Sequence, residues 1–401
     1  MLSWEDTPSV SAMRCSRAWV EVDLDAISHN VRQFCRLLRP TTDLMAVVKA
    51  DAYGHGAVAT ARTSLDAGAT WLGVATVPEG IELRQAGLQA PILVMGALHH
   101  AEEVQALARW QLQPTIVTPK QALVFANALS DACLPLPVHI KLDTGMSRLG
   151  FDWQRALEFI EFVSGLPTLQ ITSLYSHFAT ADEVDETEMR CQHERFESAI
   201  AMLRHHNRLP ARLHLANTAA TLTDAKHLQY DMVRVGLGLY GLSPAPHLNS
   251  TLDLRPALEV KARITHIKQI PAGAGVSYGH SFIAPQPMTI AVVGIGYADG
   301  IPRLLSNQLQ VLIGHQWVHQ IGAITMDQLM LDISNIDGLK EGDVVTFIGG
   351  GSTSPQITAD DWANSLGTIS WEILCGFKHR LPRIVARNSF RELYPTEDSL
   401  L

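Results

Sequence analysis

Residues 46–56 read AVVKADAYGHG, an apolar run that ends at a lysine and continues into a glycine-bearing segment. A rhythm of this kind repeats from about residue 43 to 240: a short run rich in β-branched residues, then a stretch with apolar side chains at helical spacing. Strands that alternate with helices predict a parallel sheet. Eight units in about 200 residues favour a closed (β/α)8 barrel over the alternative, an open doubly wound sheet. The predicted strands are 44–49, 71–76, 91–96, 114–118, 138–143, 169–177, 212–216 and 233–237.

The pattern changes after the proline-rich stretch SPAPHLNSTLDLRP at 243–256. Short alternating runs follow, separated by Gly and Pro, and they predict a mostly antiparallel β domain over 250–387. One predicted helix, over 360–376, interrupts it. The whole chain is therefore expected to consist of a flexible extension (1–16), a barrel (17–249), the β domain and a tail (388–401).

Composition excludes several classes of partner. The chain has 401 residues, 47% of them hydrophobic, and a formal net charge of −9, so it offers no basic surface for nucleic acid or anionic membrane. No apolar run is long enough to span a bilayer, and the first residues do not resemble a secretory signal. The five cysteines (Cys15, Cys35, Cys133, Cys191 and Cys375) are scattered and form no C-x-x-C pair. They predict a cytoplasmic protein without structural disulfides or a metal site.

Residues at the carboxyl ends of barrel strands carry chemistry in this architecture. Lys49 ends the first predicted strand, and burial would favour its neutral, nucleophilic amine. Arg148 and His177 follow later strands, while Thr218 and the glycines of RVGLGLYG (234–241) offer a hydroxyl and amides for a phosphate. Taken singly, Lys49 could simply reach solvent, His177 could be structural, and Arg234 could be an internal ion-pair partner. Together on one rim, they point to an aldehyde cofactor with a phosphate, pyridoxal 5'-phosphate.

The chain resembles the alanine racemase family over residues 17–387, in motifs spread across both domains. The resemblance implies a homodimer with active sites shared between the barrel of one subunit and the β domain of the other. It also implies that a first strand near 13–21 pairs with the C-terminal domain. The matching motifs are AVVKADAYGHG, KLDTGMSRLG (141–150), SHF-x-x-AD (176–182), HLANTAA (214–220), RVGLGLYG, VSYGHSF (276–282), IGYADGIPR (295–303) and ITMDQLM (324–330).

The resemblance implies a role for each matching residue. Lys49 would hold the cofactor covalently and act as one acid/base group, and Tyr278 of the partner subunit would be the other. Two groups on opposite faces can remove a proton from Cα and return it to the other side without moving. Arg148 would contact the phenolic oxygen of the cofactor and help to bind substrate, His177 would pack near the pyridine ring, and Arg234 would face its nitrogen. Phosphate contacts would come from Tyr53, Thr218, Gly236 and Leu237, and Asn217 would also bind the cofactor. Substrate-carboxylate contacts would come from Met326 and Asp327, and a corridor to the site from Asp182, Tyr297 and Arg303.

Several positions depart from the family pattern. Trp371 stands where many members have a phosphate-contacting tyrosine, so the preference between alanine and serine is open, because an indole has only an N–H donor. Ser147 replaces a common glycine. Lys141 matches a lysine that some members carry as a carbamate, although Ala323 replaces an arginine that accompanies it. Two other functions stay open: a fold-type III amino-acid decarboxylase, disfavoured by Arg234, and a noncatalytic pyridoxal-phosphate carrier, disfavoured by the β domain and Tyr278.

Overall fold

The computed structural model describes residues 17–130, 133–223, 225–350 and 355–386, and the chain divides into two compact units. The barrel unit contains residues 25–52 and 56–256, and the β unit contains 17–24, Tyr53–His55 and residues from 257 onward. The boundaries differ from the predicted one at 249/250. Segment 250–256 joins the barrel unit, where the Arg255 amide donates to Asn30 Oδ1 at 2.8 Å. The predicted extension over 1–16 and the tail over 388–401 lie outside the described residues.

The barrel unit is a closed ring of eight parallel strands, which confirms the predicted fold class. Strand β2 pairs with both β3 and β10, and the β5–β6 pairing closes the ring. All eight predicted runs form strands of this ring. They are β2 (Asp43–Val47), β3 (Trp71–Val74), β4 (Ile92–Val94), β5 (Gln113–Ile116), β6 (Leu136–Asp143), β8 (Leu169–Tyr175), β9 (Arg212–His214) and β10 (Met232–Val235); β7 (Phe151–Asp152) adds a short pairing to β6.

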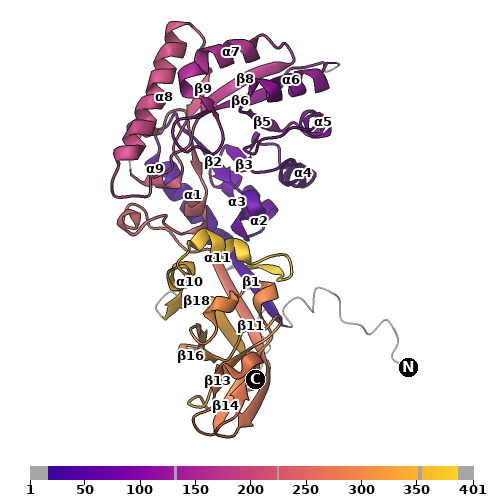
Figure 1. Cartoon of the computed structure of the whole chain (residues 1–401), viewed down its shortest axis with the longest axis vertical. Helices are drawn as coiled ribbons and strands as arrows, with labels where there is room; N and C mark the ends of the chain where they lie inside the picture. The colour runs from indigo at the N-terminus through magenta and orange to yellow at the C-terminus, as the bar shows by residue number, and fades with distance from the viewer. Residues whose placement is uncertain (1–16, 131–132, 224, 351–354, 387–401) are drawn as a thin grey trace, which may run out of the picture. The chain divides into compact units, whose positions relative to one another are not determined.

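Helices connect successive strands and lie around the outside of the ring (Figure 1). Local sequence signals mark the start of a helix, as α6 illustrates. There Thr118 Oγ1 accepts from the Gln121 amide at 3.1 Å, and Pro119 occupies the first helical position. The helices are α1 (Leu24–Leu37), α2 (Lys49–Tyr53), α3 (Ala57–Asp66), α4 (Val77–Gln85), α5 (Ala101–Arg109), α6 (Pro119–Ala128), α7 (Ala156–Ser164), α8 (Thr187–His205) and α9 (Thr218–Leu222).

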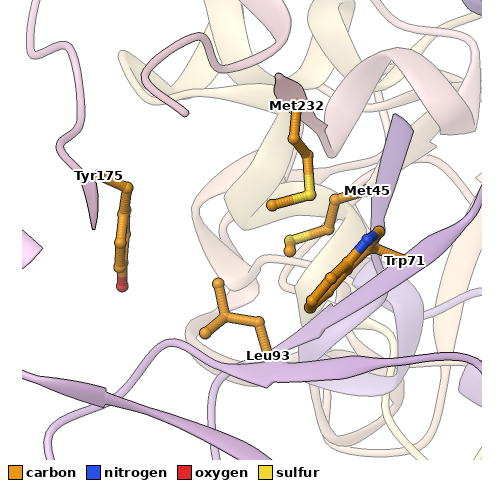
Figure 2. Close-up of a cluster of buried hydrophobic side chains, with 5 residues drawn as sticks. All are labelled: Met45, Trp71, Leu93, Tyr175 and Met232. Atoms are coloured by element: carbon orange, nitrogen blue, oxygen red, sulfur yellow. The ribbon is translucent and has the colours of Figure 1, made fainter. Parts of the chain in front are cut away.

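Large side chains fill the interior of the ring. Five strands contribute one residue each to a buried cluster, which Figure 2 shows: Met45, Trp71, Leu93, Tyr175 and Met232. A packed interior of this kind leaves the strand ends and their loops as the place for a site.

The β unit is built on a nine-stranded, mostly antiparallel sheet. An additional β11–β18 pairing closes six of its strands into a ring, β18-β15-β16-β17-β14-β11. The first strand, β1 (Ala18–Asp23), pairs antiparallel with β11 and parallel with β20, so its described part joins the C-terminal sheet. The other strands of this sheet are β11 (Leu258–Ile270), β14 (Met288–Val293), β15 (Gln310–Ile313), β16 (Gln316–Ile321), β17 (Leu329–Asp332), β18 (Val344–Gly350), β19 (Gln356–Ile357) and β20 (Arg383–Ala386). Strands β12 (Gly275–Val276) and β13 (Phe282–Ile283) pair with each other in a separate two-stranded sheet.

The single helix predicted over 360–376 is wrong, because the structure has two helices there. Helix α10 (Ala359–Leu366) begins with a capping box, in which the Asp361 amide donates to Thr358 Oγ1 at 3.1 Å. It ends at Gly367, whose φ of 67° is the left-handed conformation that terminates a helix. Helix α11 (Ser370–Gly376) then starts afresh and carries Trp371.

Two glycines of the barrel unit provide a matched test of close packing. Gly87 and Gly241 have φ of +83° and +84°, but a Cβ on Gly87 would meet nothing within 4 Å, whereas one on Gly241 would lie 1.8 Å from the Arg255 carbonyl oxygen. We expect Gly87→Ala to lower the free energy of unfolding by about 1 kcal/mol from backbone strain. Gly241→Ala should cost at least about 2 kcal/mol more from overpacking. Urea unfolding of both variants checks this, and equal costs would contradict the clash.

Candidate active site

Lys49 lies just beyond the carboxyl end of β2, at the start of a left-handed turn. Ala50, Asp51 and Ala52 have φ of 53°, 52° and 52°, with ψ of 50°, 46° and 49°. Consecutive non-glycine residues rarely adopt this conformation, which costs about 1–2 kcal/mol per residue. Such strain persists only where surrounding contacts fix it, and it is concentrated at functional sites.

Side-chain carboxylates hold this turn in place. Glu79 Oε1 accepts from the Ala50 amide at 2.8 Å, while its Oε2 accepts from the Ala75 and Thr76 amides at 2.7 and 3.0 Å. Asp51 Oδ1 accepts from the Ala57 amide at 2.7 Å. Glu79 therefore ties the segment after Lys49 to the end of the neighbouring strand β3. Glu79 was not predicted from the sequence, although its local signal is the Thr76-x-x-Glu79 spacing of a capping box at the start of α4.

The loop after β6 carries Arg148, an exposed side chain. Asp143 Oδ1 shapes the loop by accepting from the Gly145 and Ser147 amides at 2.9 and 3.0 Å. Ser147 has a φ of +56°, which explains why glycine suits this position. Lys141, inside β6, is buried, and burial together with the charges of Arg234 and Arg148 lowers its pKa to about 8.

Arg234 is a buried cation held by neutral acceptors. Its Nη1 donates to His214 Nδ1 at 2.9 Å, and its Nη2 donates to the carbonyls of Ser176 and Leu215 and to His177 Nδ1, at 2.8, 3.0 and 2.9 Å. Within the described ranges no carboxylate lies within ion-pair distance of it. Burial lowers the pKa of Arg234 to about 10, so it stays charged at neutral pH. Burial and the Arg234 charge hold the pKa values of His177 and His214 well below normal.

Three of the predicted phosphate contacts lie together at the ends of β9 and β10. The Gly236 amide donates to Thr218 Oγ1 at 2.9 Å, and Leu237 begins the short 3₁₀ helix Leu237–Tyr240. Asn217 shapes this region, because its Oδ1 accepts from the Ala220 amide at 3.0 Å and caps α9. The backbone also lies close to neighbouring side chains, since a Cβ on Gly238 would lie 2.4 Å from the Phe34 ring. Tyr53 is assigned to the β unit, and burial raises its pKa.

Tyr278 lies in the β unit on the short 3₁₀ turn Tyr278–His280. The preceding residue, Ser277, is at φ 64°, and its hydroxyl donates to the Ala323 carbonyl at 2.7 Å. This strained and anchored backbone presents a tyrosine side chain that is 75% exposed. So large an exposed fraction is unusual for an aromatic side chain.

A charged network supports the loop that carries Met326 and Asp327. The Tyr297 and Ala298 amides donate to the Thr325 and Met326 carbonyls at 3.0 and 3.1 Å. Buried Asp299 accepts two 2.7 Å hydrogen bonds from Arg17, while Arg380 lies between Asp299, at 3.5 Å, and Asp327, at 2.5 Å. Neither Asp299 nor Arg380 was predicted from the sequence.

The other predicted residues are placed as follows. Asp182 lies in the loop between β8 and α8 of the barrel unit, and Arg303 starts the 3₁₀ helix Arg303–Leu305 of the β unit. Across the described residues, no group of three or more His, Cys, Asp or Glu could hold a metal ion. In the same part of the chain, no helix combines the length and apolar character needed to cross a membrane.

Comparisons with known proteins identify the family. Residues 22–244 match the family model described as alanine racemase, N-terminal domain, and residues 257–385 match alanine racemase, C-terminal domain. The chain is 63% identical over 370 residues to the alanine racemase of Nostoc sp., covering 92% of this chain and 95% of that one.

Solved structures agree with these matches. Alanine racemase from Bacillus anthracis, solved with bound L-Ala-P, superposes with a TM-score of 0.87 at 36% identity, covering 93% of this chain and 95% of that one. Alanine racemase from Bartonella henselae with covalently bound pyridoxal phosphate gives 0.81 at 29% identity, covering 92% and 99%.

These matches place the chain among the barrel-type amino-acid racemases, a class of isomerases. The chain belongs to the alanine racemase family, whose activity is the interconversion of L- and D-alanine.

Proposed function

We propose that the protein interconverts L- and D-alanine with pyridoxal 5'-phosphate bound at the barrel strand ends, using Lys49 and Tyr278 of the partner subunit as its two acid/base groups. One observation carries this proposal: Arg234, on the same barrel as Lys49, is a buried cation without a carboxylate partner among the described residues. The charge of Lys49 contributes to lowering the pKa values of His177 and Lys141, which supports a common location for these three groups.

The residues at the strand ends fit the cofactor. Thr218, Gly236 and Leu237 offer a hydroxyl and backbone amides, which suit a phosphate. When bound, pyridoxal phosphate delocalises the negative charge that develops at the substrate Cα. Arg234 would discourage a proton on the pyridine nitrogen, because a guanidinium only donates hydrogen bonds. A less complete electron sink keeps charge near Cα and favours racemisation over transamination.

Each face of the substrate needs its own proton-transfer group. Lys49 would move the Cα proton on one face and Tyr278 on the other, while Met326, Asp327 and Arg148 orient the substrate carboxylate. A Tyr278 side chain that is 75% exposed within one chain supports its delivery to a partner, and hence a homodimer. Tyr53 remains a proposed phosphate contact and Asn217 a proposed cofactor-binding residue, and Asp182, Tyr297 and Arg303 remain proposed corridor residues. A cytoplasmic location and a role in supplying D-alanine for peptidoglycan also remain predictions.

A direct assay tests this function. The purified protein, supplied with pyridoxal phosphate, should abolish the optical activity of L-alanine and of D-alanine alike. Failure to interconvert the two forms by a cofactor-loaded, folded sample would overturn the proposal. Loss of CO2 from the amino acid would indicate the decarboxylase alternative instead.

Lys141 is proposed as a carbamylation site. Its pKa of about 8 leaves part of the amine neutral near neutral pH, and the surrounding cations Arg234, Arg148 and Lys49 would stabilise an anion there. The neutral amine attacks CO2 and releases one proton to give the carbamate. We expect a carbamate carbon signal in ¹³C NMR with labelled bicarbonate, growing as pH rises through 8 and absent in Lys141→Arg. A spectrum in which Lys141→Arg retains the signal would assign it elsewhere.

Trp371 is the proposed determinant of side-chain preference. An indole N–H cannot reproduce the hydrogen bonds of a tyrosine hydroxyl, which both donates and accepts. We expect Trp371→Tyr to change the ratio of kcat/KM for alanine over serine by about threefold to tenfold, since one altered polar contact is worth about 1 kcal/mol. Racemisation of both amino acids is measured in parallel, with Trp317→Tyr, a half-exposed residue of strand β16, as the control. An unchanged ratio would remove Trp371 from the specificity pocket.

A further inference from the structure

A continuous chain of hydrogen bonds leads from Arg234 through the interior of the barrel unit. Arg234 Nη1 lies 2.9 Å from His214 Nδ1, and His214 Nε2 lies 2.9 Å from Ser173 Oγ. Ser173 Oγ lies 2.6 Å from His139 Nδ1, and His139 Nε2 lies 2.9 Å from Gln113 Oε1. The side chains of His139, Ser173 and His214 are fully buried. After Arg234 on β10, the series of hydrogen bonds takes one residue each from β9, β8 and β6, and it ends at Gln113 on β5.

Each donor in this chain is determined by the link before it. A guanidinium can only donate, so His214 Nδ1 must accept and His214 Nε2 must carry the hydrogen. His214 then donates to Ser173, whose single hydroxyl hydrogen is left for His139 Nδ1. His139 therefore carries its hydrogen on Nε2 and donates to the Gln113 oxygen, the atom that faces it.

Beyond Arg234, the side chains of this hydrogen-bonded series are polar but uncharged. Burial lowers the pKa of His139 to about 3, with a further contribution from Arg212. Burial and Arg234 hold the pKa of His214 well below its usual value, because a protonated ring would place N–H against N–H of the guanidinium. Neutral imidazoles with fixed hydrogens act as oriented dipoles, and they leave the charge of Arg234 uncompensated.

Neighbouring rings fix the planes of both imidazoles. Tyr175 stacks on His214 with ring centroids 4.5 Å apart and 7° between planes, and Trp71 meets His139 edge-on at 5.6 Å and 90°. Thr115 Oγ1 donates to the Val94 carbonyl at 2.9 Å, so the Tyr175 hydroxyl must donate to Thr115, at 2.7 Å. The rings are therefore oriented before any ligand binds.

We propose that His139 is a positioning residue: through Ser173 it stabilises the Nε2-protonated tautomer of His214 that Arg234 requires, and His214 in turn holds the Arg234 cation where the proposed function requires it. Without an acceptor at position 139, the Ser173 hydroxyl can turn and donate to His214 Nε2. His214 would then carry its hydrogen on Nδ1, facing the Arg234 donors, and Arg234 Nη1 would lose its acceptor. The inference rests on the proposed function for its consequence in catalysis, but not for the tautomer itself.

The test is ¹⁵N NMR of the imidazole nitrogens at neutral pH, in protein with and without pyridoxal phosphate. The wild-type His214 should give the pattern of a neutral ring protonated on Nε2. His139→Leu should raise the population protonated on Nδ1 at least about tenfold, since a buried hydrogen bond is lost. His139→Asn keeps an acceptor oxygen for Ser173 and should restore the wild-type pattern. Ser64→Ala, a buried change in helix α3 at a hydroxyl that takes no part in these hydrogen bonds, should leave the His214 tautomer unchanged.

Kinetics provide the second readout. In His139→Leu, kcat for alanine should fall about tenfold with KM within about twofold, because Arg234 acts on the reaction and not on alanine binding. An unaltered His214 tautomer in His139→Leu overturns the proposal, and so does a His139→Asn variant that behaves like His139→Leu. His139→Phe, which keeps a flat ring but has no acceptor, provides the same test if His139→Leu does not fold. Failure of the wild type to racemise alanine, with His214 still responding to His139, would overturn the proposed function and leave the positioning role intact.

Discussion

Lys49→Ala is expected to reduce racemisation of alanine by at least about 10³-fold. The amine has two tasks in the proposed reaction, covalent attachment of the cofactor and proton transfer at Cα, and general acid/base catalysis alone contributes about 10²–10⁴-fold. The fold should persist, because the left-handed turn is held by Glu79 and Asp51 through backbone amides. Initial rates from both enantiomers, with far-UV circular dichroism for the fold, provide the measurement.

Lys141 is the rival amine, and the experiment has to distinguish the two. It is buried, its pKa is lowered to about 8, and it lies within electrostatic range of Lys49. Borohydride reduction of the cofactor-loaded wild type, followed by peptide mapping, should leave the cofactor mass on Lys49. A label on Lys141, or a Lys49→Ala variant within tenfold of the wild type, would reject the assignment. Lys120→Ala, an exposed lysine of helix α6, is the matched control and should retain full activity.

The barrel and its strand ends were predictable from sequence because both depend on local pattern. Each of the eight strands overlaps a short, largely apolar run of the sequence, and a parallel barrel places the carboxyl ends of its strands on one rim. Lys49, Thr218 and Arg234 could therefore be singled out before any contact was known. Gly367 was a local signal for the break between α10 and α11. The left-handed conformation of this glycine, however, depends on the helix end that it caps.

Residues that act through distant contacts were not predictable in this way. Arg17 binds Asp299 across 282 positions of sequence, and β1 joins the C-terminal sheet by pairing with β11 and β20. His214 lay within a recognised motif, but its role depends on Ser173 and His139, which lie on two other strands. Glu79 likewise acquires its function only when the backbone after Lys49 adopts its left-handed turn.

Tyr278→Phe is expected to separate the two faces of the reaction. Net racemisation should fall by about 10²–10⁴-fold in both directions, because each turnover needs both groups. Exchange of the Cα proton with D2O should persist for the enantiomer whose proton faces Lys49 and be lost for the other, as followed by ¹H NMR of each pure enantiomer. Tyr230→Phe removes a hydroxyl bonded to Glu197 in the barrel unit and should leave both exchanges intact. Equal loss of exchange for the two enantiomers would contradict a two-base reaction.

Co-expression tests whether the tyrosine comes from the partner. A Lys49→Ala chain and a Tyr278→Phe chain are each inactive alone, but a mixed dimer with shared sites would contain one site with both residues intact. Random pairing makes half of the dimers mixed, with one of two sites working, so about a quarter of wild-type activity should return. If each chain used its own Tyr278, no combination would restore a complete site and activity would stay at background. Because both outcomes come from the same pair of folded chains, recovered activity would mean that one subunit supplies its Tyr278 to the site of the other.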